Sequence, residues 1–335
     1  MRVLSSDVPE RVWHSSGVGT WTDRGGASTA PLGTATAVTI GTFDGVHRGH
    51  QALLRRTREV AEGLPVVAVT FDPHPVAVFA PDRVPPRLTS LQRRIELLHE
   101  PAPGVRGADH VRVLDFDRAM AGWSPEEFVE RVVVEELGAR HVVVGENFTF
   151  GAKAAGTTET LRDLCDRHGC DASAFTLVGD GHGADGVPWS STRVRALVAE
   201  ARLEEAAELL GRPHEVDGVV TPGDQRGRDL GFPTANVPVQ ADYCVPPDGV
   251  YAGRLLTGDA DYPAAISVGT NPTFAGTERR VESYVMDHGH DLDLYGRPVR
   301  VQLVSHLRPM VAYRGVDALV EQMHADVEQA RAALA

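Results

Sequence analysis

Two histidines three residues apart, His47 and His50, are the first side chains whose type and spacing could do chemistry. Gly49 stands between them, and the run 37–40 before them is short, apolar and β-branched, as in a buried strand. A helix that begins at about Gly49 would leave free N–H groups and the positive end of its dipole beside both imidazoles. Such a helix start attracts phosphate, and both histidines could stabilise charge on a phosphorus atom under attack. Metal binding is the competing chemistry, but the sequence offers no obvious third ligand nearby.

A second candidate is the hydroxyl-rich and basic segment 190–195, which reads Ser-Ser-Thr-Arg-Val-Arg. Hydroxyls and guanidinium groups at a helix start suit a triphosphate. Alone, the segment would more simply be a helix cap followed by solvated arginines. However, a His-x-Gly-His run after a first strand resembles the nucleotidylyl transferases, which attack the α-phosphate of ATP and carry such a loop late in the same domain. Together the two segments favour nucleotide chemistry.

A third candidate is the glycine-rich run 218–236 in the second half of the chain. Glycine lets backbone N–H groups approach phosphate closely. The spacing differs from that of a Walker A loop and from that of a dinucleotide-binding fingerprint. Without further context, the turn-rich corner of a barrel is the simpler interpretation.

Alternating strands and helices must position the first two candidates. The predicted strands are 37–40, 66–71, 111–116, 141–144 and 175–178. Two predicted helices begin at about Gly49 and at Ser124, where Ser-Pro-Glu-Glu forms a capping box. Three more predicted helices cover 91–99, 161–168 and 193–210. This alternation predicts a mostly parallel sheet with ligands at the carboxyl ends of its strands.

The pattern changes after Gly211 and Pro213, where we expect the domain boundary. Short strands separated by Gly and Pro turns predict an antiparallel barrel, followed by an amphipathic helix. The predicted elements are strands 216–221, 249–256, 264–268, 281–286 and 299–307 and the helix 316–334. We therefore expect an α/β domain over 1–210 and a barrel domain over 211–335. Residues 13–34 are rich in Gly, Ser and Thr and are expected to form a flexible insertion, with order beginning at Ala35.

Composition limits the class of protein. The 335 residues exceed one typical core, and 42% apolar with 24% charged residues is ordinary for a globular chain. The net charge of -13 argues against general binding to nucleic acid or anionic membranes. Three cysteines, no apolar run after Arg2 and no stretch near the roughly 20 apolar residues of a membrane span favour the cytoplasm.

The candidate segments occur in the same order along the chain as the sequence motifs of one protein family. The runs 41–50 (GTFDGVHRGH), 70–75 (TFDPHP), 145–151 (GENFTFG) and 190–195 (SSTRVR) resemble the adenylyltransferase half of bacterial bifunctional riboflavin kinase/FAD synthetases. The run 227–236 (GRDLGFPTAN) resembles the riboflavin kinase motif of the same family, and later segments fit it as well: 247–252, 269–274, 281–282 and 293–296. The resemblance covers nearly the whole chain outside 13–34.

The resemblance implies two reactions. A six-stranded antiparallel β-barrel with a C-terminal helix would move the γ-phosphoryl group of ATP to riboflavin, giving FMN and ADP. A Rossmann-like nucleotidylyl transferase domain would then join AMP to FMN, giving FAD and pyrophosphate. ATP, riboflavin, FMN and FAD are the expected partners and Mg²⁺ the expected cofactor. We also expect transient self-association, and no nucleic acid or membrane partner.

The resemblance also implies a role for each candidate residue. In adenylyl transfer, the catalytic residues would be His47, His50 and Arg195, the phosphate contacts Gly41, Phe43, Asn147, Ser191 and Thr192, and the flavin contacts His74, Pro75 and Phe150. In the kinase reaction, Glu282 would be the general base, Thr234 and Asn236 the Mg²⁺ ligands, and Gly223, Gly227 and Arg228 phosphate contacts. By residue type alone, Phe150 could be a core residue and Glu282 a solvated charge on a strand, but the motif context favours the functional roles.

Two other functions remain open. One is an enzyme with a single activity, in which one domain has decayed. The motifs at both sites argue against it. The other is a flavin-sensing module without turnover, against which the presence of His47, His50 and Glu282 argues.

Overall fold

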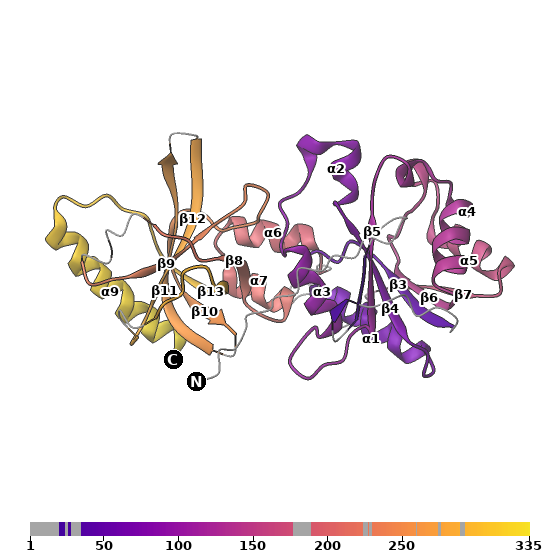
Figure 1. The fold of residues 1–335 in the computed structure, drawn as a ribbon, viewed down its shortest axis with the longest axis horizontal. Helices are drawn as coiled ribbons and strands as arrows, with labels where there is room; N and C mark the ends of the chain where they lie inside the picture. Colours follow the sequence, from indigo (N-terminus) through magenta and orange to yellow (C-terminus); the bar gives the residue numbers. More distant parts are fainter. Residues whose placement is uncertain are drawn as a thin grey trace. The chain divides into compact units, whose positions relative to one another are not determined.

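The computed structural model describes residues 20–23, 26–27, 35–176, 189–223, 227, 230–258, 260–273, 276–288 and 292–335. By their contacts, the residues form two units (Figure 1). The first comprises 1–43, 50–84 and 95–179, and the second comprises 44–49, 85–94 and 180–335. The turn 44–49 therefore groups with the second unit, although the strand before it belongs to the first.

The first unit contains a seven-stranded sheet in the order β2-β1-β5-β4-β3-β6-β7. Its strands are β1 (Thr20–Asp23), β2 (Gly26–Ala27), β3 (Thr36–Ile40), β4 (Val66–Asp72), β5 (His110–Asp115), β6 (Ala139–Gly145) and β7 (Asp171–Phe175). The five strands from β5 to β7 run parallel, whereas β1 is antiparallel to β5. The mostly parallel α/β sheet predicted from the sequence is thus confirmed.

The expectation that order begins at Ala35 is wrong for β1 and β2. Residues 20–23 pair with β5 in the register Thr20↔Val113 to Asp23↔His110. β5 ends the parallel part of the sheet, and its open edge provides hydrogen-bonding groups for a further strand. The Gly and Ser content of the surrounding region concealed the short β-forming run Thr-Trp-Thr that fills this edge.

Helices cover the sheet, and every residue of β3 is buried. Figure 1 shows α4 and α5 on one face of the sheet, where Phe128 and Leu161 pack against β3 and β6. The helices of this unit are α1 (Arg48–Val60, whose first two residues belong to the turn 44–49), α2 (Pro75–Phe79), α3 (Leu91–His99, shared with the second unit), α4 (Pro125–Phe128) and α5 (Thr158–Arg167), with short 3₁₀ segments η1 (Pro81–Arg83), η2 (Met120–Gly122) and η4 (Ala152–Ala154).

Three elements differ in detail from the prediction. The capping box at Ser124 is present, but from Val129 to Glu136 the helix continues as the π-helix η3, with the i−5 bond Leu137 N–H to Val132 O at 3.0 Å. The predicted helix 193–210 is two helices, α6 (Ser191–Ala199) and α7 (Leu203–Leu210), separated at Ala201 by a left-handed φ of 58°. β7 ends at Phe175, and residues 177–178 of the predicted strand lie outside the described residues.

The second unit contains a six-stranded sheet in the order β8-β13-β10-β11-β12-β9, with every pairing antiparallel. Its strands are β8 (His214–Val219), β9 (Thr234–Pro238), β10 (Gly249–Thr257), β11 (Ala260–Thr273), β12 (Gly276–Val285) and β13 (Pro298–Pro309), and the helix α9 (Val316–Leu334) follows. The edge strands approach each other where Thr221 N–H donates to Asn236 O at 2.9 Å. The curled antiparallel barrel with a C-terminal helix is confirmed.

The core of the second unit extends beyond the barrel. Leu203 and Leu210 of α7 and Val194 of α6 belong to the same buried cluster as Ile266 and Val301 of the barrel. On the outside, α9 is fastened by Arg308, which donates to both carboxylate oxygens of Asp326 at 2.7 and 2.6 Å. Among the described helices, none combines the length and apolar character needed to cross a bilayer.

Candidate active sites

Three motifs of the first unit lie where neighbouring parallel strands end. Gly41 follows β3, His74 and Pro75 follow β4, and Asn147 follows β6, while β3 lies between the other two strands. Gly41 N–H donates to Val69 O of β4 at 3.0 Å, which holds the start of the turn against the neighbouring strand. Because parallel strands end at one edge of the sheet, the structure brings these segments to the edge where such folds bind ligands.

The turn after β3 has an unusual backbone. Phe43 and Val46 have φ angles of 50° and 39°, in the left-handed region that costs most for bulky and β-branched residues. Gly45 has a φ of 81°, and a Cβ atom there would lie 2.8 Å from Cδ1 of Leu88. Such strain persists only where surrounding contacts hold it, and it clusters at functional sites.

Asp44 supplies those contacts in the second unit. Its buried carboxylate accepts hydrogen bonds from Leu88 N–H at 3.0 Å, from Thr89 N–H at 3.2 Å and from Arg195 Nη2 at 2.5 Å. Its main-chain oxygen accepts a bond from Ser191 Oγ at 2.7 Å. Asp44 therefore joins the histidine turn to the SSTRVR segment. The sequence interpretation did not single it out, although it is a lone carboxylate inside the motif run 41–50.

His47 is a neutral base in this structure. It is only 5% exposed, and its pKa is lowered from 6.5 to about 4, chiefly by burial. The negative charge of Asp44 opposes this shift, while the positive charges of Arg212 and Arg195 add to it. At neutral pH the ring can donate or accept hydrogen bonds but carries no positive charge. Positive potential beside this ring comes from Arg195, Arg212 and the start of α1.

His50 lies in the first unit, in the first turn of α1. Its ring meets that of Phe43 edge to face, with ring centroids 5.1 Å apart and an interplanar angle of 72°. This contact fixes the ring of His50 against a fully buried aromatic residue. The candidate phosphate residue Phe43 thus has a clear structural role in orienting His50.

The SSTRVR segment forms the start of α6 as predicted. Ser190 caps the helix by accepting a bond from Arg193 N–H at 3.2 Å. Arg195 donates to Asp44 and, through Nε at 2.6 Å, to Pro86 O. Thr192 is exposed in the first turn, where it can reach a ligand. The structure therefore brings Ser191 and Arg195 to Asp44 and leaves Thr192 facing solvent.

The predicted flavin residues differ in environment. Phe150 is only 7% exposed, stacks on the ring of Phe148 at 5.5 Å and contacts Phe128 at 5.7 Å. It is a core residue, and its contact with flavin stays a prediction. His74 is half-buried and caps α2 through Nδ1, which accepts a bond from Val76 N–H at 3.2 Å.

The kinase residues lie on one face of the barrel. Glu282 of β12 is directly opposite Asn236 of β9, and Ser267 of β11 is opposite Glu282 on its other side. Thr234 is two residues from Asn236 and so lies on the same face of β9. The register therefore aligns the predicted base with both predicted metal ligands, which precede it by 46 and 48 positions in the chain.

Asn236 is held in one orientation. Its Nδ2 donates to Thr234 O at 3.1 Å and to Thr234 Oγ1 at 3.4 Å, which turns the amide oxygen away from Thr234. Gly223 lies close to the side chain of Asn236, because a Cβ atom at Gly223 would be 2.6 Å from that carboxamide. Gly227 accepts bonds from Leu230 N–H at 3.1 Å and Phe232 N–H at 2.7 Å. Arg228 lies outside the described residues.

A cavity of about 360 Å³ opens beside Glu282. Its lining comes from the residue before β10, from β11 and β12, and from the residue after β13: Asp248, Ser267, Gly269, Thr270, Arg280, Glu282 and Met310. Glu282 thus faces a cavity and is no ordinary solvated charge on a strand. Arg280 places a cation on the same face of β12, two residues away.

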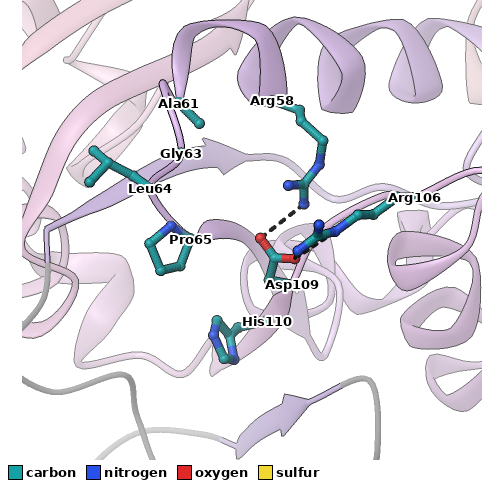
Figure 2. Close-up of a pocket in the computed structure, with 8 residues that line it drawn as sticks. All are labelled: Arg58, Ala61, Gly63, Leu64, Pro65, Arg106, Asp109 and His110. Atoms are coloured by element: carbon teal, nitrogen blue, oxygen red, sulfur yellow. Dashed lines mark hydrogen bonds and ion pairs between the residues drawn. The ribbon is translucent and has the colours of Figure 1, made fainter.

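The larger cavity, of about 630 Å³, lies at the opposite end of the first sheet (Figure 2). Figure 2 shows Arg58 and Arg106 both directed at Asp109, with distances of 2.9 and 2.5 Å. Asp109 also accepts a bond from Val66 N–H at 2.9 Å, at the start of β4. These contacts tie the end of α1 to the amino ends of the strands. The cavity contains none of the candidate residues, so its size does not identify the site.

Fold and sites together define a two-domain transferase that uses a nucleotide at two places. The family models agree: that of FAD synthetase matches residues 31–192, and that of riboflavin kinase matches residues 210–334. The bifunctional riboflavin kinase/FMN adenylyltransferase of Escherichia coli K12 is 37% identical over 88% of this chain and 91% of its own length. That of Bacillus subtilis 168 is 32% identical over the same shares.

A solved structure supports the fold over both halves. The crystal structure of a macrolide-efflux protein from Streptococcus pneumoniae matches 90% of this chain and 96% of that chain, with a TM-score of 0.77 and 32% identity.

This chain belongs to the bifunctional riboflavin kinase/FMN adenylyltransferase family. It phosphorylates riboflavin to FMN and adenylylates FMN to FAD, with the adenylyltransferase part first in the chain and the kinase part second. The two reactions predicted from the sequence are confirmed, and the comparisons favour neither the single-activity enzyme nor the sensing module.

Proposed function

We propose that Glu282 is the general base of the kinase reaction. The observation that supports this is its register opposite Asn236, beside the 360 Å³ cavity. A ribityl hydroxyl oxygen of riboflavin attacks the γ-phosphorus of ATP, its proton passes to the carboxylate of Glu282, and the bond to the β-γ bridging oxygen breaks to release ADP. A carboxylate on the acceptor hydroxyl takes up the proton as the bond forms, while positioning and electrostatics supply most of the rate.

Thr234 and Asn236 fit a magnesium ion shared with ATP. A hydroxyl and an amide oxygen on one face of β9 are hard ligands of the kind that Mg²⁺ prefers. Among the described residues, no group of three His, Cys, Asp or Glu could hold a metal, which suits an ion held largely by phosphates and water. When bound, Mg²⁺ neutralises charge on the phosphates. Asn236, oriented by Thr234, would fix the position of that charge, and Gly223, Gly227 and Arg228 would contact the phosphates.

For adenylyl transfer, we propose that His47 and His50 contact the ATP phosphates. A phosphate oxygen of FMN attacks the α-phosphorus, and the bond to the α-β bridging oxygen breaks to release pyrophosphate. Neutral His47 donates a hydrogen bond as charge builds on the phosphorus oxygens. Arg195, Ser191, Thr192 and Asn147 would hold the remaining phosphate groups, with Gly41 and Phe43 shaping the turn. His74, Pro75 and Phe150 would contact the flavin.

Two variants of the full chain test the two-site assignment. Glu282→Gln should abolish FMN formation from riboflavin and leave FAD formation from supplied FMN unchanged. His50→Ala should do the reverse. If either change removes both activities from a folded protein, the assignment of one site to each reaction is wrong.

We also propose a boundary at 210/211, between an adenylyltransferase domain (1–210, with an insertion at 13–34) and a kinase domain (211–335). The two family matches, which end at 192 and begin at 210, support it. A cytoplasmic location is supported by three free, buried cysteines. The net charge of -13 supports the absence of a nucleic acid partner. Transient self-association stays a prediction.

A further inference from the structure

A carboxylate of the barrel is buried where a solvated charge would be expected. Glu215 is the second residue of β8, and its side chain is only 2% exposed. Its neighbour Val216 points to the barrel core, so Glu215 points outward. Burying a carboxylate costs several kcal/mol unless cations surround it. Three do: Arg93 Nε at 2.6 Å, Arg212 Nε at 3.4 Å and Arg300 Nε at 3.7 Å.

One of these cations holds the histidine turn. Arg212 donates through Nη2 to Gly45 O at 2.8 Å and lies near Val46 O, at 3.5 Å from Nη1. These two carbonyls immediately precede His47, in the stretch where the backbone is left-handed. The guanidinium fork therefore bridges the barrel carboxylate and the strained turn, an arrangement that a lysine could not reproduce.

The guanidinium groups around Glu215 keep its carboxylate in the charged form that binds Arg212. Burial alone would raise the pKa of Glu215, but Arg212, Arg93 and Arg300 lower it below its usual value, so the carboxylate stays ionised. The same turn is held on its other side by Asp44, whose carboxylate binds Arg195 and the backbone at 88–89. Arg87, next to that segment, accepts a bond through its main-chain oxygen from Cys244 N–H at 2.9 Å, in the connection between β9 and β10.

We propose that Glu215, a residue of the kinase barrel, is a positioning residue for adenylyl transfer: it holds Arg212, which fixes the carbonyl of Gly45 and so the placement of His47. The inference rests on the proposed role of the histidines. It makes the adenylyl transfer reaction depend on two residues that lie after the proposed domain boundary. The kinase reaction, whose residues lie on other strands, does not depend on them.

The test uses Glu215→Gln and Arg212→Lys in the full chain. FAD formation from supplied FMN and FMN formation from riboflavin are measured on the same samples, with kcat and KM for each. For both variants we expect kcat for FAD formation to fall about tenfold or more, because a small misplacement of a catalytic group has effects of this size or larger. KM for ATP and FMN and both kinase parameters should change less than about threefold.

Arg93→Lys is the matched control, because Arg93, on α3, binds the same carboxylate oxygen of Glu215 as Arg212 does. It should leave FAD formation intact. If Glu215→Gln does not fold, Arg212→Lys decides alone, since it retains the charge that Glu215 requires. Equal losses in both reactions, or no loss in either, overturn the proposal, because they indicate a general structural role or none. His50→Ala is measured in parallel. If His50→Ala leaves FAD formation intact, the histidine assignment and this proposal both fail. If FAD formation is lost in His50→Ala but not in Glu215→Gln or Arg212→Lys, only this proposal is overturned.

Discussion

Glu282 and Asn236 face each other directly across the β9–β12 ladder. One is a carboxylate suited to accept a proton, and the other is an amide held by Thr234 at 3.1 Å. Directly opposed residues in a sheet lie about 5 Å apart at their Cβ atoms, close enough to contact the same substrate group. The proposed proton acceptor and the proposed phosphate-side ligand are therefore adjacent, as transfer from ATP to a hydroxyl requires.

The first prediction follows from this pair. Asn236→Ala removes the amide oxygen proposed to bind Mg²⁺ and leaves Glu282 in place. The Mg²⁺ concentration that gives half-maximal FMN formation should rise about tenfold or more, on the scale of other losses from metal sites. FAD formation from supplied FMN, measured with Mg²⁺ in excess, should not change. A magnesium dependence equal to that of the unmodified chain would remove Asn236 from the metal site.

Gly223 provides a steric test of the same place. A Cβ atom at Gly223 would overlap the carboxamide of Asn236 at 2.6 Å, so Gly223→Ala must displace that side chain. Overpacking of this kind costs about 1–3 kcal/mol of stability. We expect loss of FMN formation together with a lower unfolding midpoint in urea. Gly122→Ala, where a Cβ atom meets nothing within 4 Å, is the control and should change neither. Full kinase activity in Gly223→Ala would show that Asn236 need not keep its position.

The pKa of His47 predicts how stability depends on pH. The unfolded chain binds a proton near pH 6.5, whereas folded His47 does so only near pH 4. Between these values the unfolded state carries more protons, so the free energy of unfolding falls as pH falls. From pH 7 to pH 5 this one group should cost about 2 kcal/mol. Buried His214, whose pKa burial also lowers, acts in the same direction.

Replacing His47 by Gln isolates the part of this pH dependence that comes from His47. Urea unfolding of the unmodified chain and of His47→Gln at pH 7 and pH 5 gives the difference directly. The variant should lose less stability between the two values, and His214→Gln should reduce the loss further when combined with it. An identical pH dependence in both chains would mean that His47 is protonated in the folded state as readily as in the unfolded state.

The sequence predicted most of what local patterns encode. The apolar run 37–40 predicted β3, and the capping box at Ser124 predicted the start of α4. Both signals depend only on residues that are close together in the sequence. The register that places Glu282 against Asn236 could not be derived in this way, because strands so far apart pair only through tertiary packing. β9 itself was missed, since five residues with a proline at the end give little strand signal.

The same limit explains the residues that were missed around the histidine turn. Asp44 was inside a quoted motif, but its partners Leu88 and Arg195 are distant in sequence. Glu215 lies just before the predicted strand 216–221 and was not singled out, and only its three guanidinium neighbours explain its burial. Long-range ion pairs leave no periodic pattern in a sequence, whereas the left-handed turn that they hold was at least marked by Gly45.

Phe150 decides between packing and flavin contact. It lies in the same aromatic cluster as Phe128, and the two rings are 5.7 Å apart. Phe150→Leu and Phe128→Leu should each destabilise the fold by about 1–3 kcal/mol, less than the loss for Phe→Ala in a core. If Phe150 also contacts the flavin, only Phe150→Leu should raise the KM for FMN in FAD formation. Phe128, which has no proposed contact with a substrate, is the control. If the KM for FMN is unchanged in both variants, Phe150 is a core residue alone. The half-buried ring of Phe148, which stacks on Phe150, would then be the one to test for flavin contact.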